Sequence, residues 1–230
     1  MRIFANCKEA INEIERDIHE MGIQVHPHTM QNKSVRYDDA YKTKEVRAYS
    51  FMILDSSDKD EIVGDCLPWC KAEFKERVSL QPINPGKAWE LRKEIWEEFL
   101  DKNGKFDYTY NERMFIQWIA VVQELRRNPD TRQAIIQIHN RDVDQERMST
   151  LRIPCSMYYQ LMVREEALDI IYNMRSSDFY THFKNDIWLA CELRDMISGL
   201  LKVPKGKFYM FISSLHMYKG YGHGEDKHVF

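Results

Sequence analysis

Cys155 has the chemistry of a nucleophile, and it directly follows a proline in the apolar stretch RIPCSMYYQ at 152–160. The thiolate is the reactive form of cysteine, and a neighbouring guanidinium favours that form. A cysteine in an apolar strand is also, more often than not, a small core residue. Taken alone, this stretch leaves both interpretations open.

Polar groups of complementary chemistry are concentrated between residues 126 and 218. Guanidiniums, a hydroxyl, carboxylates and an imidazole accompany the thiol. Arginine binds phosphate through two parallel hydrogen bonds, and a thiolate beside a bound phosphate suits attack on a phosphorylated, electron-poor substrate. The set is Arg126, Arg127, Arg132, Cys155, Arg175, Ser176, Asp178, Asn185, Asp186, His216 and Tyr218.

Five motifs in this half of the chain follow an order that resembles the thymidylate synthase superfamily: NPDTR, IPC, MRSSD, HFKND and SLHMY. In that family an arginine-bearing turn, a Pro-Cys nucleophile, an Arg-Ser-x-x-Asp segment and a His-x-Tyr segment occur in this order. The similarity covers residues 96–221, and YTYNERM at 108–114 resembles a Tyr-Gly segment with Asn111 in place of glycine. NMRSSD and SLHMY are similar to the phage deoxycytidylate hydroxymethylases of the same superfamily.

The resemblance implies a role for each residue that binds the nucleotide. Cys155 would add to C6 of a pyrimidine nucleoside monophosphate and so make C5 nucleophilic. The phosphate ligands would be Arg175 and Ser176, joined by Arg132 from the neighbouring subunit, which implies a homodimer with shared active sites. The sugar hydroxyl would be held by His216 and Tyr218, and Asn185 lies beside the residue that contacts the base.

The same resemblance implies 5,10-methylenetetrahydrofolate as cofactor. Asp178 matches the position that orients the pterin ring and helps to order the site. Aromatic residues near the folate would be Trp96 and Tyr110, although Trp96 suits helix packing equally well. The family uses a helical glutamate to manage water and protons near C5, for which Glu73 is the candidate and Glu76 the reserve.

Three departures from the family pattern affect the expected phosphate site. Gln133 stands where a second arginine usually follows Arg132, and Arg126 or Arg127 is the candidate replacement. Met174 stands where a glutamine usually precedes the phosphate arginine. The family's glycine-rich, arginine-bearing loop near the N-terminus is not visible in this sequence.

Asp186 is the position expected to select the base. Counting from Arg175 without gaps places it where thymidylate synthases carry the asparagine that contacts uracil. Cytosine presents an unprotonated N3 and an N4 amino group, and a carboxylic acid can donate to the first and accept from the second. The same proton would assist thiolate addition, which requires Asp186 to have a raised pKa or to share a proton with the base. In the alternative, Asn185 is the equivalent residue and the enzyme binds uracil.

The predicted reaction is folate-dependent C5 hydroxymethylation of a cytosine nucleotide, dCMP or CMP. Only GYGHGEDKHVF follows SLHMYK, which is shorter than the segment that closes the site in methylating members, so we expect water to complete the reaction. Alternatives within this chemistry are a dUMP hydroxymethylase and a C5-methylating enzyme. Outside it stand a cysteine hydrolase that uses Cys155 with His216 and a non-catalytic nucleotide-binding relative.

Composition favours a cytoplasmic protein. The net charge of −3 and the pI of about 6.3 give no basic surface for nucleic acid or an anionic membrane. The N-terminus lacks the layout of a signal peptide, and no apolar run is long enough to cross a bilayer. Five cysteines predict reduced thiols. The pair Cys66 and Cys70 lacks the further ligands of a zinc site, so no metal is expected.

Apolar periodicity predicts helices and strands that could position these residues. We expect one domain over residues 1–230, of the α+β class, with helices on a mixed sheet as in thymidylate synthase. The N-terminal helix should place Ile11, Ile14, Ile18 and Met21 on one face and end at Gly22. Other helices are expected at 65–78, 86–104, 111–127 and 185–201, the last with Ile187, Ala190, Leu193 and Ile197 facing inward.

Strand patterns dominate the second half of the chain. Residues 156–163 and 168–176 should form a hairpin around the polar REEA. Further strands are expected within 34–55, where charged residues interrupt the pattern, and at 134–139 and 207–218.

Overall fold

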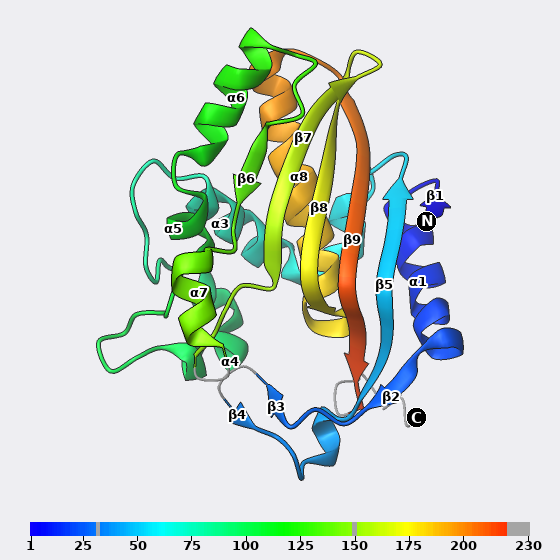
Figure 1. Cartoon of the computed structure of the whole chain (residues 1–230), viewed down its shortest axis with the longest axis vertical. Coiled ribbons are helices and arrows are strands. Elements are labelled where there is room, and N and C mark those ends of the chain that lie inside the picture. Colours follow the sequence, from blue (N-terminus) through cyan, green and yellow to red (C-terminus); the bar gives the residue numbers. More distant parts are fainter. Residues whose placement is uncertain (31–32, 149–150, 220–230) are drawn as a thin grey trace.

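The computed structural model describes residues 1–30, 33–148 and 151–219 and is built around one mixed β-sheet (Figure 1). A separate antiparallel pair is formed by β3 (Thr29–Met30) and β4 (Lys33–Ser34). The strands of the sheet are β1 (Arg2–Phe4), β2 (Ile23–Val25), β5 (Thr43–Ile53), β6 (Ile135–Gln137), β7 (Ser156–Arg164), β8 (Ala167–Asp178) and β9 (Lys205–Tyr218).

The strand order is β1-β5-β9-β8-β7-β6, with β2 also paired to β5. Strand β9 runs parallel to β8 and antiparallel to β5, and β7 runs antiparallel to β8. The hairpin between β7 and β8 turns through Glu165 and Glu166, whose φ angles are 52° and 63°. Two consecutive left-handed residues match the twist of the flanking strands. The predicted hairpin is therefore confirmed.

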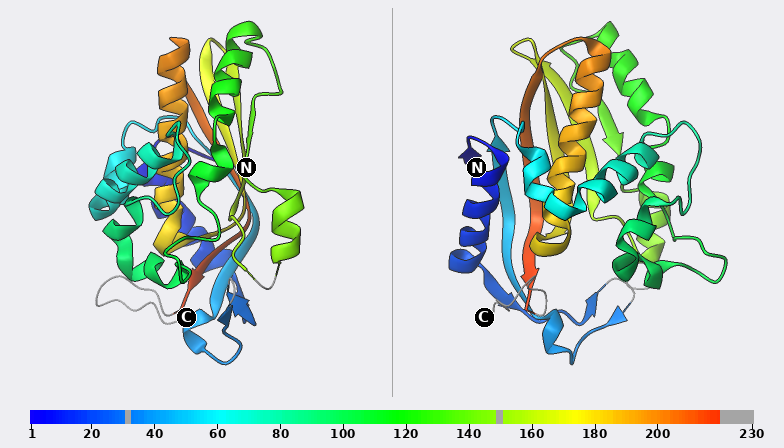
Figure 2. Two further views of the ribbon diagram at one scale, coloured as in Figure 1. Left: turned by 90° about the vertical axis from the view of Figure 1, so that its left-hand side faces the viewer. Right: turned by 180° about the vertical axis from the view of Figure 1, so that it is seen from behind.

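Helices cover one face of the sheet, while α7 lies on the other side (Figure 2). The α-helices of the described residues are α1 (Cys7–Met21), α2 (Lys59–Val63), α3 (Leu67–Arg77), α4 (Lys93–Trp96), α5 (Tyr110–Met114), α6 (Gln117–Arg127), α7 (Arg141–Arg147) and α8 (Lys184–Leu201). The parallel pair of β8 and β9 needs a crossover connection, and α8 supplies it. The α+β class with a mixed sheet is confirmed; the extent of one domain over 1–230 stays a prediction.

The core lies between this helical layer and the sheet. Phe51 of β5 is fully buried and contacts the rings of Phe4, Phe183 and Phe208 at centroid distances of 5.9–6.0 Å. Tilted and edge-on rings at this separation add to the free energy gained from burying them. All four residues of α8 expected to face inward are buried: Ile187, Ala190, Leu193 and Ile197.

Strands β5, β8 and β9 change their burial pattern toward one end of the sheet. In β9, Phe208, Met210 and Ile212 are buried, but beyond them the buried residues are Leu215 and Met217. Neighbouring strand β5 has Ala48 at φ 53° close to this switch. An irregular residue of this kind bends and twists a strand. Residues past the bend therefore point to different faces than strict alternation would predict.

Two predicted helices are broken in the structure. Residues 86–104 do not form one helix: α4 is flanked by 3₁₀ turns at Ala88–Arg92 and Glu97–Phe99, because Arg92 adopts non-helical angles (φ −140°, ψ 47°). Residues 111–127 divide into α5 and α6 at Ile116, which is left-handed at φ 53°. Helical spacing alone did not reveal these breaks.

No helix in the described ranges is long and apolar enough to cross a membrane.

Candidate active site

The ends of three strands assemble the polar residues of the second half at one end of the sheet (Figure 1). The carboxyl ends of β8 and β9 lie together because the strands are parallel. Strand β7 begins at the same end because it is antiparallel to β8. Cys155 immediately precedes β7, and Asp178 and His216 are register partners on β8 and β9. Sheet topology thus brings these distant residues together.

Cys155 is partly exposed, and two predicted site residues surround its thiol. Its Sγ lies 3.6 Å from the Ser176 hydroxyl and 3.7 Å from Nη2 of Arg175. The Arg175 backbone N–H donates to the Cys155 carbonyl over 2.8 Å. The Cys155 sulfur therefore has a guanidinium and a hydroxyl group beside it.

Arg175 also holds the segment before the cysteine. Its Nε donates to the Pro154 carbonyl over 2.9 Å and its Nη2 to the Ile153 carbonyl over 3.1 Å. A third contact, of 3.1 Å, joins Nη1 to the Ser176 hydroxyl. Arg175 therefore fixes the position of the cysteine as well as placing a positive charge beside it.

A buried hydroxyl network lies behind the cysteine. Ser156 donates to the Tyr110 hydroxyl over 3.1 Å and makes a short contact with the Tyr172 hydroxyl. Burial raises the pKa of Tyr110, and the nearby Cys155 and Asp186 raise it further. The Tyr110 hydroxyl is therefore neutral and lies near both the Cys155 thiol and the Asp186 carboxyl group.

Asp186 sits in the first turn of α8 and is 9% exposed. Burial raises its pKa from 3.8 to about 7, against the lowering effects of Arg77 and of the Ser177 hydroxyl. That hydroxyl donates to Oδ2 over 3.0 Å. One oxygen of the Asp186 carboxyl group is thus bound to Ser177. Near neutral pH, about half of the molecules carry a proton on this carboxyl group.

Asn185 is turned toward the helical layer. Its Oδ1 accepts from the Cys70 thiol over 3.5 Å, and its Nδ2 donates to the Thr181 carbonyl over 3.3 Å. Both ends of this amide are used within the protein core. The adjacent side chains of Asn185 and Asp186 therefore have different surroundings.

Asp178 and His216 form an electrostatically linked pair at the ends of β8 and β9. Burial raises the pKa of Asp178, and His216 opposes this; burial also lowers the pKa of His216, and Asp178 opposes that. The imidazole lies 5.1 Å from the ring of Tyr218, edge to face. Nearby, the Ser214 hydroxyl donates to Glu45 over 2.6 Å. This end of the sheet can exchange hydrogen bonds with a polyhydroxylated group such as a sugar.

Glu73 and Glu76 of α3 have different partners. Glu73 accepts from Nε of Arg77 over 2.8 Å, and Arg77 is buried with its guanidinium 3.9 Å from the centre of the Tyr110 ring. Glu76 accepts hydrogen bonds from the backbone N–H groups of Lys87 and Ala88. Burial raises the pKa of Glu76, and these two hydrogen bonds oppose the rise only in part. Glu76 therefore holds a turn, whereas Glu73 is joined through Arg77 to the tyrosine behind Cys155.

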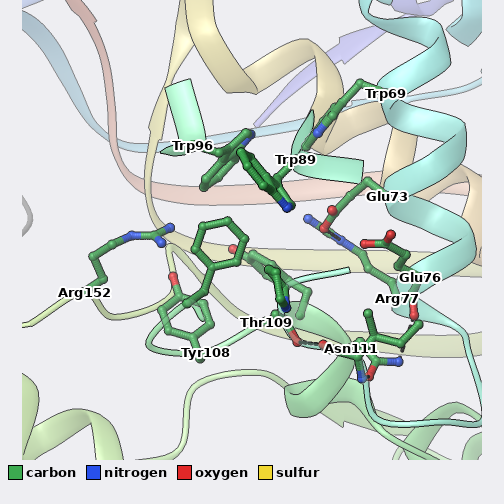
Figure 3. Close-up of a pocket in the computed structure, with 14 residues that line it drawn as sticks. Trp69, Glu73, Glu76, Arg77, Trp89, Trp96, Tyr108, Thr109, Asn111 and Arg152 are labelled. Atoms are coloured by element: carbon green, nitrogen blue, oxygen red, sulfur yellow. Dashed lines mark hydrogen bonds and ion pairs between the residues drawn. The ribbon is translucent and has the colours of Figure 1, made fainter. Parts of the chain in front are cut away.

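A pocket lined by aromatic and charged side chains adjoins this end of the sheet (Figure 3). Arg152 approaches it from one side, and Glu73, Glu76 and Arg77 lie on the opposite side. Trp96, a predicted folate contact, and Tyr110 are both part of the lining, with Trp69, Trp89, Phe106 and Tyr108. Aromatic walls with a few charged groups suit a flat conjugated ring.

Arg132 lies apart from the cysteine. Its carbonyl accepts from Gln160 over 2.8 Å, and Gln160 is five residues along β7 from Cys155, about 16 Å in an extended strand. The side chains of Arg132 and Gln133 are exposed. Arg126 donates to the Leu200 carbonyl at the far end of α8, so this candidate replacement for the second phosphate arginine lies away from Cys155.

Sequence reasoning missed several residues of the site, notably Arg77, Arg152, Ser177, Trp69 and Tyr108. A signal for Arg152 was available, because it opens the RIPC stretch that holds the nucleophile. Arg77 could not be separated from an ordinary helical surface arginine. Among the described residues no group of His, Cys, Asp and Glu could hold a metal ion. The C-terminal segment expected to be a short lid lies outside the described residues.

Comparisons with known proteins agree on one family. The model for the family described as Thymidylate synthase matches residues 85–228. Deoxycytidylate 5-hydroxymethyltransferase of Enterobacteria phage T4 is 26% identical over 198 residues, or 77% of this chain and 76% of that protein. Deoxyuridylate hydroxymethyltransferase of Bacillus phage SP01 is 27% identical over 99 residues, or 43% of this chain and 26% of that protein.

Solved structures show the same fold. The thymidylate synthase of T4 phage superposes with a TM-score of 0.70 at 17% identity, covering 94% of this chain and 78% of that one. Thermostable thymidylate synthase A of Bacillus subtilis superposes with a TM-score of 0.64 at 18% identity, covering 91% of this chain and 78% of that one.

The buried Asp186 should make stability depend on pH in a defined window. Its folded pKa is about 7 against an ordinary 3.8, so the folded state keeps a proton that the unfolded state loses, and stability falls as pH rises from about 4 to 7. Asp186→Asn removes this loss. We expect the difference in Tm between the variant and the parent to increase by at least about 5 °C from pH 4 to pH 7 and to change little above pH 7.

The control for this measurement is Asp142→Asn, because Asp142 is an exposed carboxylate (78% of its side chain). Differential scanning calorimetry in steps of one pH unit should show no such trend for the control. A constant Tm difference between Asp186→Asn and the parent at every pH would show that the carboxyl is not held protonated.

Proposed function

The chain belongs to the thymidylate synthase family and is a one-carbon transferase, and we propose that it hydroxymethylates C5 of a cytosine nucleotide, dCMP or CMP. The observation that carries the choice of cytosine is the buried carboxyl of Asp186, half protonated near neutral pH and anchored through one oxygen by Ser177. A neutral carboxyl can donate to N3 and accept from the N4 amino group of cytosine. An uracil-binding amide at Asn185 is less well supported, because that side chain is bound to Cys70 and Thr181.

Cys155 would begin the reaction by forming a bond from Sγ to C6 of the base. Arg175 and Ser176, at 3.7 and 3.6 Å from the sulfur, would hold it in place and would also face the nucleotide phosphate. As C6 is attacked, negative charge develops toward N3, and the proton of Asp186 would neutralise it. C5 thereby becomes the nucleophile and, once bonded to the one-carbon unit, gives up its own proton. When the C5 substituent is complete, the Sγ–C6 bond breaks, which restores the C5–C6 double bond and releases Cys155 as its thiolate.

Methylenetetrahydrofolate, when bound, supplies a one-carbon unit at the oxidation level of formaldehyde. Trp96 and the other aromatic residues of the pocket would hold its conjugated ring, with Asp178 orienting the pterin from the end of β8. Glu73 lines the same pocket and would bind a water molecule and accept its proton, with Arg77 fixing the carboxylate. Water addition at that carbon gives a hydroxymethyl group without a reductant, and the T4 and SP01 proteins compared above by sequence are hydroxymethyltransferases.

A homodimer with shared sites completes the proposal. The sheet face opposite the main helical layer carries in-register rows of half-exposed residues, such as Ile171 beside Tyr209 and Asn173 beside Phe211. Phe211 is 39% exposed. A second copy could cover these rows by two-fold symmetry, and its exposed Arg132 would then reach the phosphate. Sugar binding by His216 and Tyr218, a cytoplasmic location and the absence of nucleic-acid binding stay predictions.

Product analysis tests the reaction directly. Mass spectrometry after incubation of dCMP, CMP or dUMP with methylenetetrahydrofolate should show a gain of one hydroxymethyl group on a cytosine nucleotide. Cys155→Ala should give no product while still binding nucleotide, because only the covalent step is lost. The matched control Cys66→Ala should keep full turnover. A methylated product would contradict water addition, and turnover by Cys155→Ala would contradict the covalent mechanism.

Exchange of the acidic residue tests the base preference. Asp186→Asn should shift the ratio of kcat/KM values for dCMP and dUMP toward dUMP by at least about tenfold, because an amide donates to O4 and accepts from N3–H of uracil. Asn185→Ala is the control and should leave the ratio unchanged. The opposite pattern, with the ratio sensitive to Asn185 and insensitive to Asp186, would identify Asn185 as the contact to the base.

Mixed dimers test the shared site. Cys155→Ala and Arg132→Ala subunits should each be nearly inactive, but refolding them together should restore about one quarter of the parental activity, because half of the dimers then contain one intact site of two. Pairing Cys155→Ala with a Cys155→Ala, Arg132→Ala double variant should restore nothing. Hybrids that form but stay inactive would show that Arg132 does not act across the interface.

A further inference from the structure

Glu45, Ser214 and His216 form a hydrogen-bonded chain on β5 and β9, two strands that lie side by side in the sheet (Figure 1). Glu45 is the register partner of His216, which makes Ser214 its diagonal neighbour across the two strands. The Ser214 hydroxyl donates to Oε2 of Glu45 over 2.6 Å. The same hydroxyl oxygen lies 3.4 Å from Nδ1 of His216. The reaction proposed above gives Glu45 no role.

The hydrogen of the Ser214 hydroxyl is committed to Glu45. A serine hydroxyl has one hydrogen to donate and two lone pairs that accept, whereas a carboxylate oxygen only accepts. A hydrogen bond to a charged oxygen is stronger than one between neutral groups, so the hydroxyl favours Glu45 over the imidazole. The Ser214 oxygen therefore meets Nδ1 of His216 as an acceptor.

A second acceptor faces the same ring nitrogen. The Ser214 carbonyl oxygen lies 3.4 Å from Nδ1 of His216, and a carbonyl only accepts. One N–H shared between two oxygens is a three-centre hydrogen bond. The tautomer of a histidine follows from such partners. Nδ1 of His216 therefore carries a hydrogen, because a bare nitrogen would face two oxygen lone pairs with no hydrogen between them.

The other ring nitrogen is an acceptor, because the imidazole of His216 is uncharged near neutral pH. Burial lowers the pKa of His216. The charges of Asp178 on β8 and of Glu45 on β5 oppose this effect without cancelling it, and Arg175 adds to it. A neutral imidazole has one N–H, so a hydrogen on Nδ1 leaves Nε2 with a lone pair.

We propose that Glu45 is a positioning residue of this site, which takes the Ser214 hydrogen and so fixes His216 with its hydrogen on Nδ1 and with Nε2 as an acceptor. The assignment rests on the proposed binding of the sugar hydroxyl by His216 and Tyr218. It gives that contact a direction: the sugar hydroxyl donates to Nε2, and its oxygen stays available to the Tyr218 hydroxyl. The site then takes a sugar hydroxyl and rejects a fluorine in its place, because two acceptors would face each other.

The tautomer can be measured without nucleotide. Two-bond ¹H–¹⁵N correlation spectra of the protein with ¹⁵N-labelled histidine separate the two neutral tautomers and the cation, and His216→Gln identifies the signals of His216. We expect the Nδ1–H form in the parent near neutral pH. Glu45→Leu should shift the population toward the Nε2–H form, because the Ser214 hydrogen can then turn to Nδ1. Glu45→Gln should keep the parental form, because its amide oxygen accepts the same hydrogen.

Equilibrium binding tests the direction of the sugar contact. Isothermal titration calorimetry compares dCMP with 3′-fluoro-2′,3′-dideoxycytidine monophosphate, in which fluorine replaces the sugar hydroxyl. The parent should bind dCMP at least about tenfold more tightly than the fluoro analogue. Glu45→Leu should lose most of this ratio, because Nε2 of His216 then donates, whereas Glu45→Gln should keep it. The control Glu61→Leu, at a side chain 59% exposed, should match the parent.

Removal of the middle group tests whether Glu45 acts through Ser214. Ser214→Ala removes the hydroxyl that joins Glu45 to His216, so adding Glu45→Leu to Ser214→Ala should change neither the tautomer nor the binding ratio further. A further change in the double variant would overturn the proposal, because Glu45 would then act by another route. A Glu45→Gln variant that behaves like Glu45→Leu would overturn it as well, since charge rather than the hydrogen bond would be responsible.

The parent protein alone can refute the proposal, whether or not the Glu45 variants fold. His216 in the Nε2–H or cationic form would overturn the hydrogen-bonded chain. The Nδ1–H form in a parent that binds dCMP and the fluoro analogue equally would overturn the sugar contact on which the assignment rests. Neither measurement contains folate, so a failure of the proposed C5 reaction would appear as missing product with the expected tautomer and binding ratio.

Discussion

The parallel pairing of β8 with β9 is the constraint on which the rest of this structure depends. Parallel neighbours must be joined by a crossover, and α8 makes that connection. The carboxyl ends of the two strands then lie side by side, so that Asp178 faces His216 and Ser176 faces Ser214. Because α8 starts where β8 ends, Asp186 is delivered to the same end of the sheet. The cysteine arrives there because β7 returns antiparallel to β8.

Burial of charge is the second organising feature. Asp186, Arg77, Arg92 and Arg152 are all nearly inaccessible to solvent, although charged groups in a protein interior are costly. Of these three arginines, only Arg77 has a carboxylate partner in the described part of the chain, which is Glu73. The cost is consistent with a site built for ligands, because a bound ligand would replace the water that these groups lost. Stability and activity are therefore expected to oppose each other here.

The aromatic layer connects these charged groups. Arg77 stacks on Tyr110, and Arg152 lies against Trp96. Tyr110 in turn accepts from Ser156, the residue after the nucleophile. Planar rings can hold a guanidinium in one orientation without neutralising it. The same pocket can therefore bind a flat ring and retain unpaired positive charge at its end.

The sequence by itself determined the fold class, the family and a part of the residue set that meets at one end of the sheet. The order of Cys155, Arg175, Asp178 and His216 carries that information, because strand and motif patterns are local. Tertiary structure decided what local patterns cannot encode: that the segment 86–104 breaks at Arg92, and that Asp186 rather than its neighbour faces Ser177. Burial decides both the pKa of Asp186 and the unpaired charge of Arg152, and burial depends on segments distant in the sequence.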